Sequence, residues 1–314
     1  MRIGIVVDSA CDLPEPFIRE NNIIVLPISV RIGDAVRTDY RDEATTLAFL
    51  ESHVAEHGSG AETTALSADE VRQLFLDTLI IDYDQVFCLT LTKNRSPLYA
   101  NVVQASYDIL RDYKPIRQAA GHPSPFALRV LDTQNLFAAQ AVMAVEAVRL
   151  RQDNATLQQM RGTLEDLSNY LHGYMVPRDL YYLRARARHK GDRSVNFMSA
   201  ALGTALDIKP ILHAHRGDTE PVAKVKGFEQ AVKALFDFTA KRVIAGLKTP
   251  VVCLSHGGAL SEMRALPGYR GLRDICEHYN VTLLESVMSL TGMVNVGKGA
   301  VVVGFADKPH TFEH

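Results

Sequence analysis

Short hydrophobic runs alternate with amphipathic segments through the first half of the chain. The runs are rich in valine, isoleucine and leucine, which is typical of strands buried on both faces of a sheet. The segments between them carry apolar residues at helical spacing. Strands are predicted at residues 2–7, 23–33, 85–91 and 127–133, and helices at residues 42–58, 67–80, 98–113 and 135–152. This alternation indicates an α/β domain with a parallel sheet over residues 1–155.

Two residues near the N-terminus modify this pattern. Pro27 lies inside the second predicted strand and has no backbone N–H, so this strand should pair only at a sheet edge or a bulge. Asp12 precedes Pro14, and the two are predicted to cap and start a helix.

The second half has a different order of elements, with strands joined by a tight turn. The pattern predicts helices at residues 154–174, 228–247 and 260–279, the last interrupted at Pro267. It predicts strands on both sides of the turn at residues 215–218 and at residues 251–256, 281–287 and 300–306. Helices mixed with hairpin-connected strands indicate an α+β domain with a mixed sheet over residues 156–314.

Composition excludes several classes of protein. The net charge of −2 over 314 residues argues against a nucleic-acid partner bound through bulk charge. No hydrophobic run approaches the roughly 20 residues of a membrane span, so no integral membrane segment is predicted. The four cysteines lie far apart and are interpreted as buried thiols of a cytoplasmic protein. No cofactor and no metal site are predicted.

Residues 292–298 read G-x-x-x-x-G-K, the spacing of a phosphate-binding loop. That loop continues with Ser or Thr to hold magnesium, whereas Gly299 follows Lys298 here. The loop also needs a helix after it, but residues 300–306 predict a strand. We therefore interpret these glycines as a turn before the last strand.

Four polar clusters lie beside predicted strands or helix starts of the first domain. Ligands of open parallel sheets bind beyond the carboxyl ends of the strands, although such residues also serve as ordinary helix caps. Hydroxyl and backbone N–H groups of two such loops together can hold an anion such as a carboxylate. The clusters are residues 8–12, 63–67, 92–97 and 132–135.

The second half offers fewer candidates. Arg193 has a guanidinium suited to a carboxylate or a phosphate, or it is a solvated loop cation. His256 follows a predicted strand and is interpreted as structural. His213 and His215 alternate on a predicted strand but lack a metal-ligand spacing with cysteine. The sequence contains no G-x-S-x-G or H-E-x-x-H motif, so no catalytic residue is predicted.

Seven segments, in order along the chain, carry a family resemblance. They are "VVDSACDLP", "VLPISV", "TTALS", "TKNRSPLY", "VLDTQNLFAAQAVMAVEAVRL", "KGDRS" with "ALGTALDIKPIL", and "NVGKGAVVVGF". The first looks like T-D-S-x-x-D-L, the third like T-S-Q-P-S, and the last like H-x-G-P-G-A-x-G-V-x-F. In this order they resemble the DegV family of bacterial fatty-acid-binding proteins.

The resemblance implies a Rossmann-like N-terminal domain and an α+β C-terminal domain with one long-chain fatty acid buried between them. The acyl chain would lie in an apolar tunnel and the carboxylate on polar loops. The resemblance also implies that the protein is not an enzyme and that, in bacteria with a fatty acid kinase, it would present the acid to that kinase. The resemblance places the carboxylate near these residues: Thr63, Thr64, Thr92, Lys93, Asn94, Ser96, Arg193, Asn295 and Gly297.

The chain departs from the family pattern at this head-group end. Lys93 and Asn94 replace Ser and Gly, and Asn295 stands where the family has His. Arg95 replaces Leu, and the two added cations, Lys93 and Arg95, suit a carboxylate or a phosphate. An alternative therefore stays open, in which a phosphotransferase-like enzyme or a hydrolase uses the cationic loops on a small anionic substrate.

Overall fold

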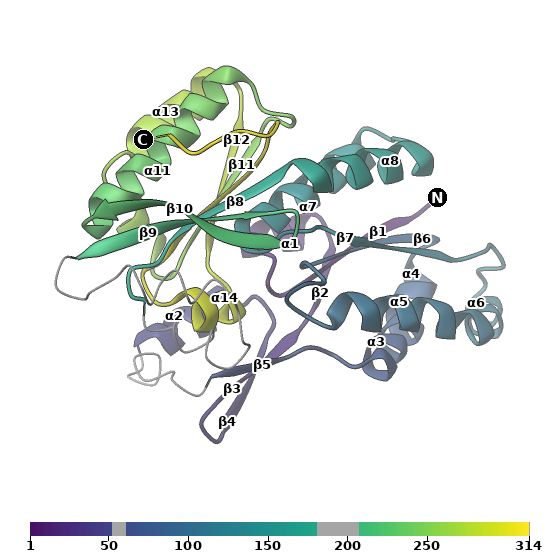
Figure 1. Cartoon of the computed structure of the whole chain (residues 1–314). Coiled ribbons are helices and arrows are strands. Elements are labelled where there is room, and N and C mark those ends of the chain that lie inside the picture. Colours follow the sequence, from purple (N-terminus) through teal and green to yellow (C-terminus); the bar gives the residue numbers. More distant parts are fainter. Residues whose placement is uncertain (52–60, 181–206, 314) are drawn as a thin grey trace.

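The computed structural model describes residues 1–51, 61–180 and 207–313, and these residues form an α/β fold with three sheets. Figure 1 shows the N-terminal parallel sheet on the right and the larger C-terminal sheet at the upper left. A small third sheet lies below the two. The predicted fold class, a parallel sheet followed by a mixed sheet, is confirmed.

The N-terminal sheet has four parallel strands, because each connection returns through helical segments. Their order is β2 (Ile23–Leu26), β1 (Ile3–Asp8), β6 (Gln85–Thr90) and β7 (Ala127–Asp132). Its helices include α1 (Glu15–Glu20), α3 (Ala68–Leu74), α4 (Ile80–Asp82), α5 (Leu98–Asp108) and α6 (Tyr113–Ala119), with a π-helical turn at Phe75–Leu79 and a 3₁₀ turn at Ile109–Arg111. All of β1 after Ile3 is buried, as its hydrophobic run predicts.

Pro27 divides the second predicted strand into two strands of different sheets, so the prediction of one strand is wrong. β2 ends at Leu26, and β3 (Ile28–Ile32) starts a separate antiparallel sheet of order β4 (Ala35–Asp39), β3, β5 (Glu62–Thr64). Because proline cannot donate to a ladder, it ends pairing on one side and lets the chain leave the first sheet. Helix α2 (Glu43–Glu51) follows this hairpin.

The C-terminal sheet has six strands. Their order is β10 (Asp218–Lys226), β9 (Ile208–His215), β8 (Leu171–Val176), β13 (Val301–Ala306), β11 (Val251–His256) and β12 (Thr282–Val287). Only β11 and β12 run parallel, so the sheet is mixed. Its helices are α11 (Phe228–Ala245), α12 (Leu260–Arg264), α13 (Tyr269–His278) and α14 (Leu290–Val296) among the residues described.

The predicted single helix over residues 154–174 is wrong in its last part. Helix α8 (Leu157–Leu167) begins at a capping box made by Thr156 and Gln159 and ends before a 3₁₀ turn at Ser168–Tyr170. Strand β8 then follows, and all six of its residues are buried between β9 and β13. Pairing with two neighbouring strands outweighs the local helical pattern.

Helix α7 (Phe137–Gln152) joins the two large sheets. It contacts β1 and β6 of the parallel sheet and β8, β11 and β13 of the mixed sheet. At Gly304 the backbones meet so closely that an added Cβ would lie 2.3 Å from the Ala138 carbonyl carbon. One hydrophobic core therefore runs through both sheets. The domain boundary at residues 155/156, which falls between α7 and α8, stays a prediction.

Two general features concern the membrane and the cysteines. None of the helices that the structure describes is long and apolar enough to cross a membrane. Cys11, Cys88, Cys253 and Cys276 are all buried and form no disulfide.

Candidate functional site

The carboxylate of Asp8 organises the loops at the carboxyl end of the parallel sheet. It accepts hydrogen bonds from Leu91 N at 2.6 Å, Ala10 N at 3.0 Å and the Gln140 amide at 3.0 Å. Burial raises the pKa of Asp8 to about 6, and these hydrogen bonds act in the opposite direction. Asp8 therefore ties the end of β1 to the start of the loop after β6 and to α7.

The loop after β6 contains Thr92 and Asn94, which lie against the C-terminal sheet. Thr92 is buried, and its backbone N–H donates to Asn135 O at 2.9 Å. Its hydroxyl oxygen accepts from Asn94 N at 3.3 Å. The Asn94 side chain donates to Gly217 O, at the β9–β10 turn, at 3.3 Å. These two predicted ligand residues thus contribute to the contact between the sheets.

Lys93 and Ser96 occupy the outer part of the same loop. The Lys93 side chain is exposed, and its backbone N–H donates to Asp132 Oδ1 at 3.4 Å. Ser96 is half-buried and its hydroxyl accepts from Leu98 N at 3.2 Å, near the start of α5. The loop therefore presents one ammonium group and one helix-start hydroxyl.

Thr63 and Thr64 lie on strand β5 and not on a loop before a helix, which corrects the sequence interpretation. Thr63 pairs with Val30 across the antiparallel ladder, so the two side chains share a face of the small sheet. Val30 packs in a hydrophobic cluster with Leu290 and Val294 of α14. Thr63 is half-buried on this face, whereas Thr64 is exposed on the other.

Asn295 lies in the last turn of α14, the helix that carries Leu290 and Val294 of this cluster, and Gly297 follows its end. The Asn295 amide donates to Thr291 O at 2.6 Å within the helix. Gly297 ends the helix with a φ of 107°, a conformation that favours glycine. A helix thus precedes the G-K pair and strand β13 follows it, the reverse of the strand–loop–helix order that a phosphate loop needs.

The predicted residues therefore fall into two neighbouring groups. Thr63 and Asn295 lie on elements that pack together, and the segment after β5 is tied to α5 by a 2.7 Å hydrogen bond from Asn101 to Leu66 O. Thr92 and Asn94 face the β9–β10 turn. Arg193 lies outside the described residues, as does the small-residue segment after it.

A buried polar network next to these groups is missing from the sequence prediction. Asp12 does not cap α1, whose N-cap is Pro14. Its Oδ1 instead accepts Ser289 N at 2.9 Å and lies 3.5 Å from Arg41 Nη1. Burial raises the pKa of Asp12, while Arg41 acts to lower it. The polar cluster at residues 8–12 is the sequence feature that points to this network. The network could not be predicted from it, because the partners of Asp12 are more than 25 residues away.

The same network continues to the N-terminus of α14. Asp39 Oδ2 accepts both the backbone N–H and the hydroxyl of Thr291 at 2.9 Å. The Ser9 hydroxyl accepts Ile28 N at 3.0 Å and lies 3.5 Å from the Thr291 hydroxyl. Hydrogen bonds thus join β1, the small sheet and α14 around the predicted head-group end.

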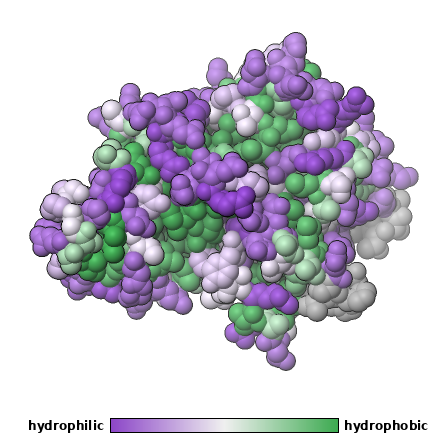
Figure 2. Space-filling view, turned by 180° about the vertical axis from the view of Figure 1, so that it is seen from behind, coloured by the Kyte–Doolittle hydropathy of each residue, from purple (hydrophilic) through white to green (hydrophobic). Residues whose placement is uncertain are grey.

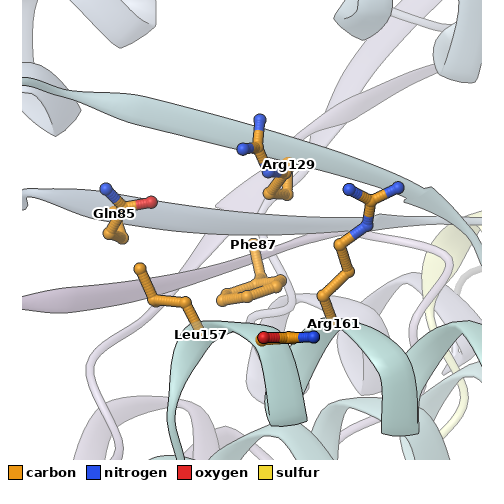
Figure 3. Close-up of a pocket in the computed structure, with 6 residues that line it drawn as sticks. Gln85, Phe87, Arg129, Leu157 and Arg161 are labelled. Carbon is orange, nitrogen blue, oxygen red and sulfur yellow. The ribbon is translucent and has the colours of Figure 1, made fainter.

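A hollow of about 240 Å³ opens elsewhere on the N-terminal sheet. Figure 3 shows it between β6 and β7 on one side and α8 on the other, with Phe87 pointing toward α8 and the Arg129 and Arg161 side chains at its rim. None of the predicted ligand residues lines it. Figure 2 shows hydrophobic side chains at the surface of the reverse face, framed by hydrophilic ones.

The protein is a mixed α/β protein. Its two large sheets share one hydrophobic core, and polar loops follow the ends of the parallel strands. The protein-family model described as an uncharacterised protein of the DegV family matches residues 2–308. The chain therefore belongs to the DegV family. A DegV domain-containing protein of Xanthomonas axonopodis pv. citri is 64% identical over 99% of both chains.

Solved structures share this fold. A DegV lipid-binding protein from Thermotoga maritima superposes with a TM-score of 0.76 at 23% identity, covering 98% of each chain. DegV from Bacillus subtilis, described as a fatty acid binding protein, superposes with a TM-score of 0.75 at 18% identity, covering 98% of this chain and 100% of its own. At these identities the comparison establishes the fold.

Proposed function

We propose that this chain binds a long-chain fatty acid between its parallel and mixed sheets. The observation that carries the proposal is membership of the DegV family over the whole chain, in which solved members are described as binding fatty acids. The carboxylate is assigned to these groups: Thr63, Thr64, the loop residues Thr92, Lys93, Asn94 and Ser96, and Arg193, Asn295 and Gly297.

The acyl chain and the carboxylate of the ligand contribute to binding in different ways. Each buried methylene contributes about 0.8 kcal/mol, so a long acyl chain supplies most of the affinity. A carboxylate removed from water needs donors or a cation. The Thr63 hydroxyl and the Lys93 ammonium are of the required kinds, and the Thr92 hydroxyl accepts from Asn94 N and so keeps its own proton to donate.

Geometry narrows the assignment within this set. Thr63 and Thr64 lie on opposite faces of β5, so one of them at most faces a buried ligand, and the half-buried Thr63 is the better candidate. The Asn94 amide is already bonded to the β9–β10 turn. Its role in the proposal is therefore to position the loop.

We infer that the protein is a carrier and not an enzyme, and that it presents the bound acid to a fatty acid kinase in the cytoplasm. The family resemblance supports this role. In the alternative, a hydrolase or phosphotransferase would use the loop that contains Lys93 and Ser96. The Ser96 hydroxyl accepts a hydrogen bond from Leu98 N at the start of α5. The alternative would be favoured if the protein hydrolyses an ester or a phosphate and the Ser96→Ala variant does not.

Mass spectrometry of an organic extract from purified protein is the direct test. We expect a fatty acid in stoichiometric amount, and saturable uptake of added acid after the protein has been delipidated. The methyl ester of the same acid should bind more weakly, because it lacks the charge that the donors are assigned to meet. An extract without acyl chains, together with no uptake of added acid, would overturn the proposal.

A further inference from the structure

Three histidines meet on one face of the C-terminal sheet, and none of them is a proposed head-group residue. His213 and His215 are two positions apart on β9, so their side chains project from the same face. His172 on the antiparallel strand β8 pairs directly with His215. One ring nitrogen from each of the three lies within 4.8 Å of the others. We call these residues the histidine cluster.

The cluster is enclosed by the sheet and by the C-terminal segment. His172 is 1% exposed and His213 is 9% exposed, while His215 is half-buried at the rim. The ring of His310, from the segment after β13, lies 4.2 Å from the ring of His172. Such a position protects the imidazoles from water and leaves entry at His215.

Hydrogen bonds to backbone carbonyls orient two of the three rings. His172 Nε2 donates to Asp307 O at 3.1 Å, so its lone pair is on Nδ1. His215 Nδ1 donates to Leu171 O at 2.9 Å, so its lone pair is on Nε2. A ring nitrogen bonded to a carbonyl is the arrangement that metal-ligating histidines use to fix tautomer and orientation.

The third ring already shares a proton with the first. His213 Nε2 lies 2.9 Å from His172 Nδ1, with the two ring planes almost parallel, at 6°. A ring nitrogen accepts a hydrogen bond only in a neutral imidazole, so His172, whose Nε2 donates to Asp307 O, presents Nδ1 in the form that binds metals.

We propose that His172, His213 and His215 bind a divalent transition-metal ion of the zinc class. The ligand atoms are His172 Nδ1, His213 Nε2 and His215 Nε2. The proton that His213 Nε2 shares with His172 moves to His213 Nδ1, so the ring stays neutral and its Nε2 lone pair is free for the metal. Imidazole ligands suit zinc, copper and nickel and not magnesium or calcium. A set of three histidines is a known zinc ligand set, with a fourth position left for water or another ligand.

Binding requires a small rearrangement of the rings. Zinc–nitrogen distances of about 2.0–2.1 Å at a tetrahedral angle place ligand nitrogens roughly 3.3–3.4 Å apart. The 2.9 Å separation of His172 and His213 must therefore open by about 0.4 Å. The rings of His172 and His215 are stacked 4.2 Å apart at 4°, so they must also turn about χ2 for their lone pairs to converge.

The remaining polar groups at the cluster are consistent with a neutral site. His310 Nδ1 donates to Lys308 O, and its Nε2 accepts the Tyr174 hydroxyl at 3.0 Å. The Asp307 carboxylate is bonded to Arg242 at 2.6 Å, so these two charges offset each other. The incoming ion therefore meets uncharged nitrogen ligands.

The test uses the full, untagged chain after treatment with EDTA. Titration with zinc by calorimetry should give one saturable site per chain, and cobalt should give the visible absorption of a tetrahedral ion without thiolate charge-transfer bands. His215→Ala should weaken zinc binding by more than the roughly 10–100-fold that loss of an outer-shell partner costs. His215 is half-buried, and an unchanged urea midpoint checks that the variant is folded.

His278→Ala is the matched control, because His278 is an exposed histidine near the end of α13. It should leave zinc and cobalt binding unchanged. The proposal is overturned if the wild-type chain binds neither ion saturably, if His215→Ala binds zinc as tightly as wild type, or if cobalt shows thiolate bands that place it on a cysteine. None of these outcomes depends on fatty acid binding.

Discussion

Arg41 and Asp12 form an ion pair in the interior of the protein, with Nη1 and Oδ1 3.5 Å apart and side chains only 3% and 0% exposed. Arg41 also donates to Leu13 O at 2.8 Å and to Ser286 Oγ at 2.7 Å. The pair thus connects the loop after β1, the segment after β4 and strand β12. Its charges hold three distant parts of the chain at the head-group end.

Asp12→Asn should destabilise the fold. The substitution leaves the buried Arg41 guanidinium without its counter-charge, and breaking a buried pair in this way costs about 3–5 kcal/mol. Urea unfolding at pH 7 measures the change. The control is Asp237→Asn, which removes an exposed partner of Lys233 and should cost less than about 1 kcal/mol. Equal effects of the two substitutions would show that the buried pair has no special role.

The raised pKa of Asp8 makes stability depend on pH. Its folded pKa of about 6 lies above the ordinary 3.8, so the folded chain keeps a proton that the unfolded chain releases. The contribution of Asp8 is therefore most favourable below about pH 4 and falls as the pH rises through about 6. Above about pH 6, ionisation of the buried Asp8 lowers the free energy of unfolding by roughly 3 kcal/mol relative to its value below pH 4.

Asp8→Asn should remove this dependence. The stability of the variant relative to wild type should rise by up to roughly 3 kcal/mol between pH 4 and pH 7, whatever its absolute value at pH 4. Urea unfolding at a series of pH values isolates the effect, because other carboxylates contribute equally to both proteins. A difference that stays constant with pH would mean that Asp8 keeps an ordinary pKa.

The hydrophobic pattern was sufficient for the order of most elements but not for their partners. It predicts the strands from Gln85 and from Val251 because continuous apolar runs mark buried strands. It assigns the first four residues of β8, 171–174, to a helix because the pairing with β9 and β13 is set by residues far away in the sequence. Pro27 limits strand pairing in a way that the sequence shows, yet its effect, the change of sheet, depends on the hairpin that follows.

The residues of the candidate site could likewise be located in the sequence, but their contacts could not be predicted from it. Sequence resemblance locates Thr63 and Asn295, whose elements do pack together, but spacing along the chain does not show that Arg41 reaches Asp12 or that His172 lies beside His215. These contacts join residues 29 and 43 positions apart. Long-range pairing of this kind follows from topology and not from local pattern.

Gly304→Ala should weaken the packing of α7 on β13. A Cβ at this position would lie 2.3 Å from backbone atoms of Ala138 and Ala139, which cannot move as a side chain can. Overpacking costs about 1–3 kcal/mol or more, measured as a lower thermal midpoint. Gly162→Ala on α8 is the control, since its Cβ meets open space and alanine favours a helix by about 1 kcal/mol. A tolerated Gly304→Ala would mean that the helix and strand are less closely packed.

Asn295→His should introduce a pH dependence into fatty acid binding. Asparagine carries no charge, so binding to wild type should lack a step from this position between about pH 5 and 8. Histidine in the last turn of α14 would become cationic below about pH 6.5 and attract the carboxylate. Equilibrium binding at several pH values tests this. A profile without a step in both proteins would show that the side chain does not face the ligand.

Thr63→Val should weaken fatty acid binding while Thr64→Val should not, because neighbouring residues of β5 face opposite sides of the small sheet. Removing a hydroxyl that donates to a carboxylate costs about 1.5–3 kcal/mol, which is roughly 10–100-fold in affinity. Valine matches threonine in shape and suits a strand, so both variants should fold. The affinities of the acid and of its methyl ester are measured by displacement of a fluorescent acyl probe. Thr63→Val should leave the affinity for the ester unchanged. Equal losses in both variants, or a loss in Thr64→Val alone, would place the carboxylate elsewhere.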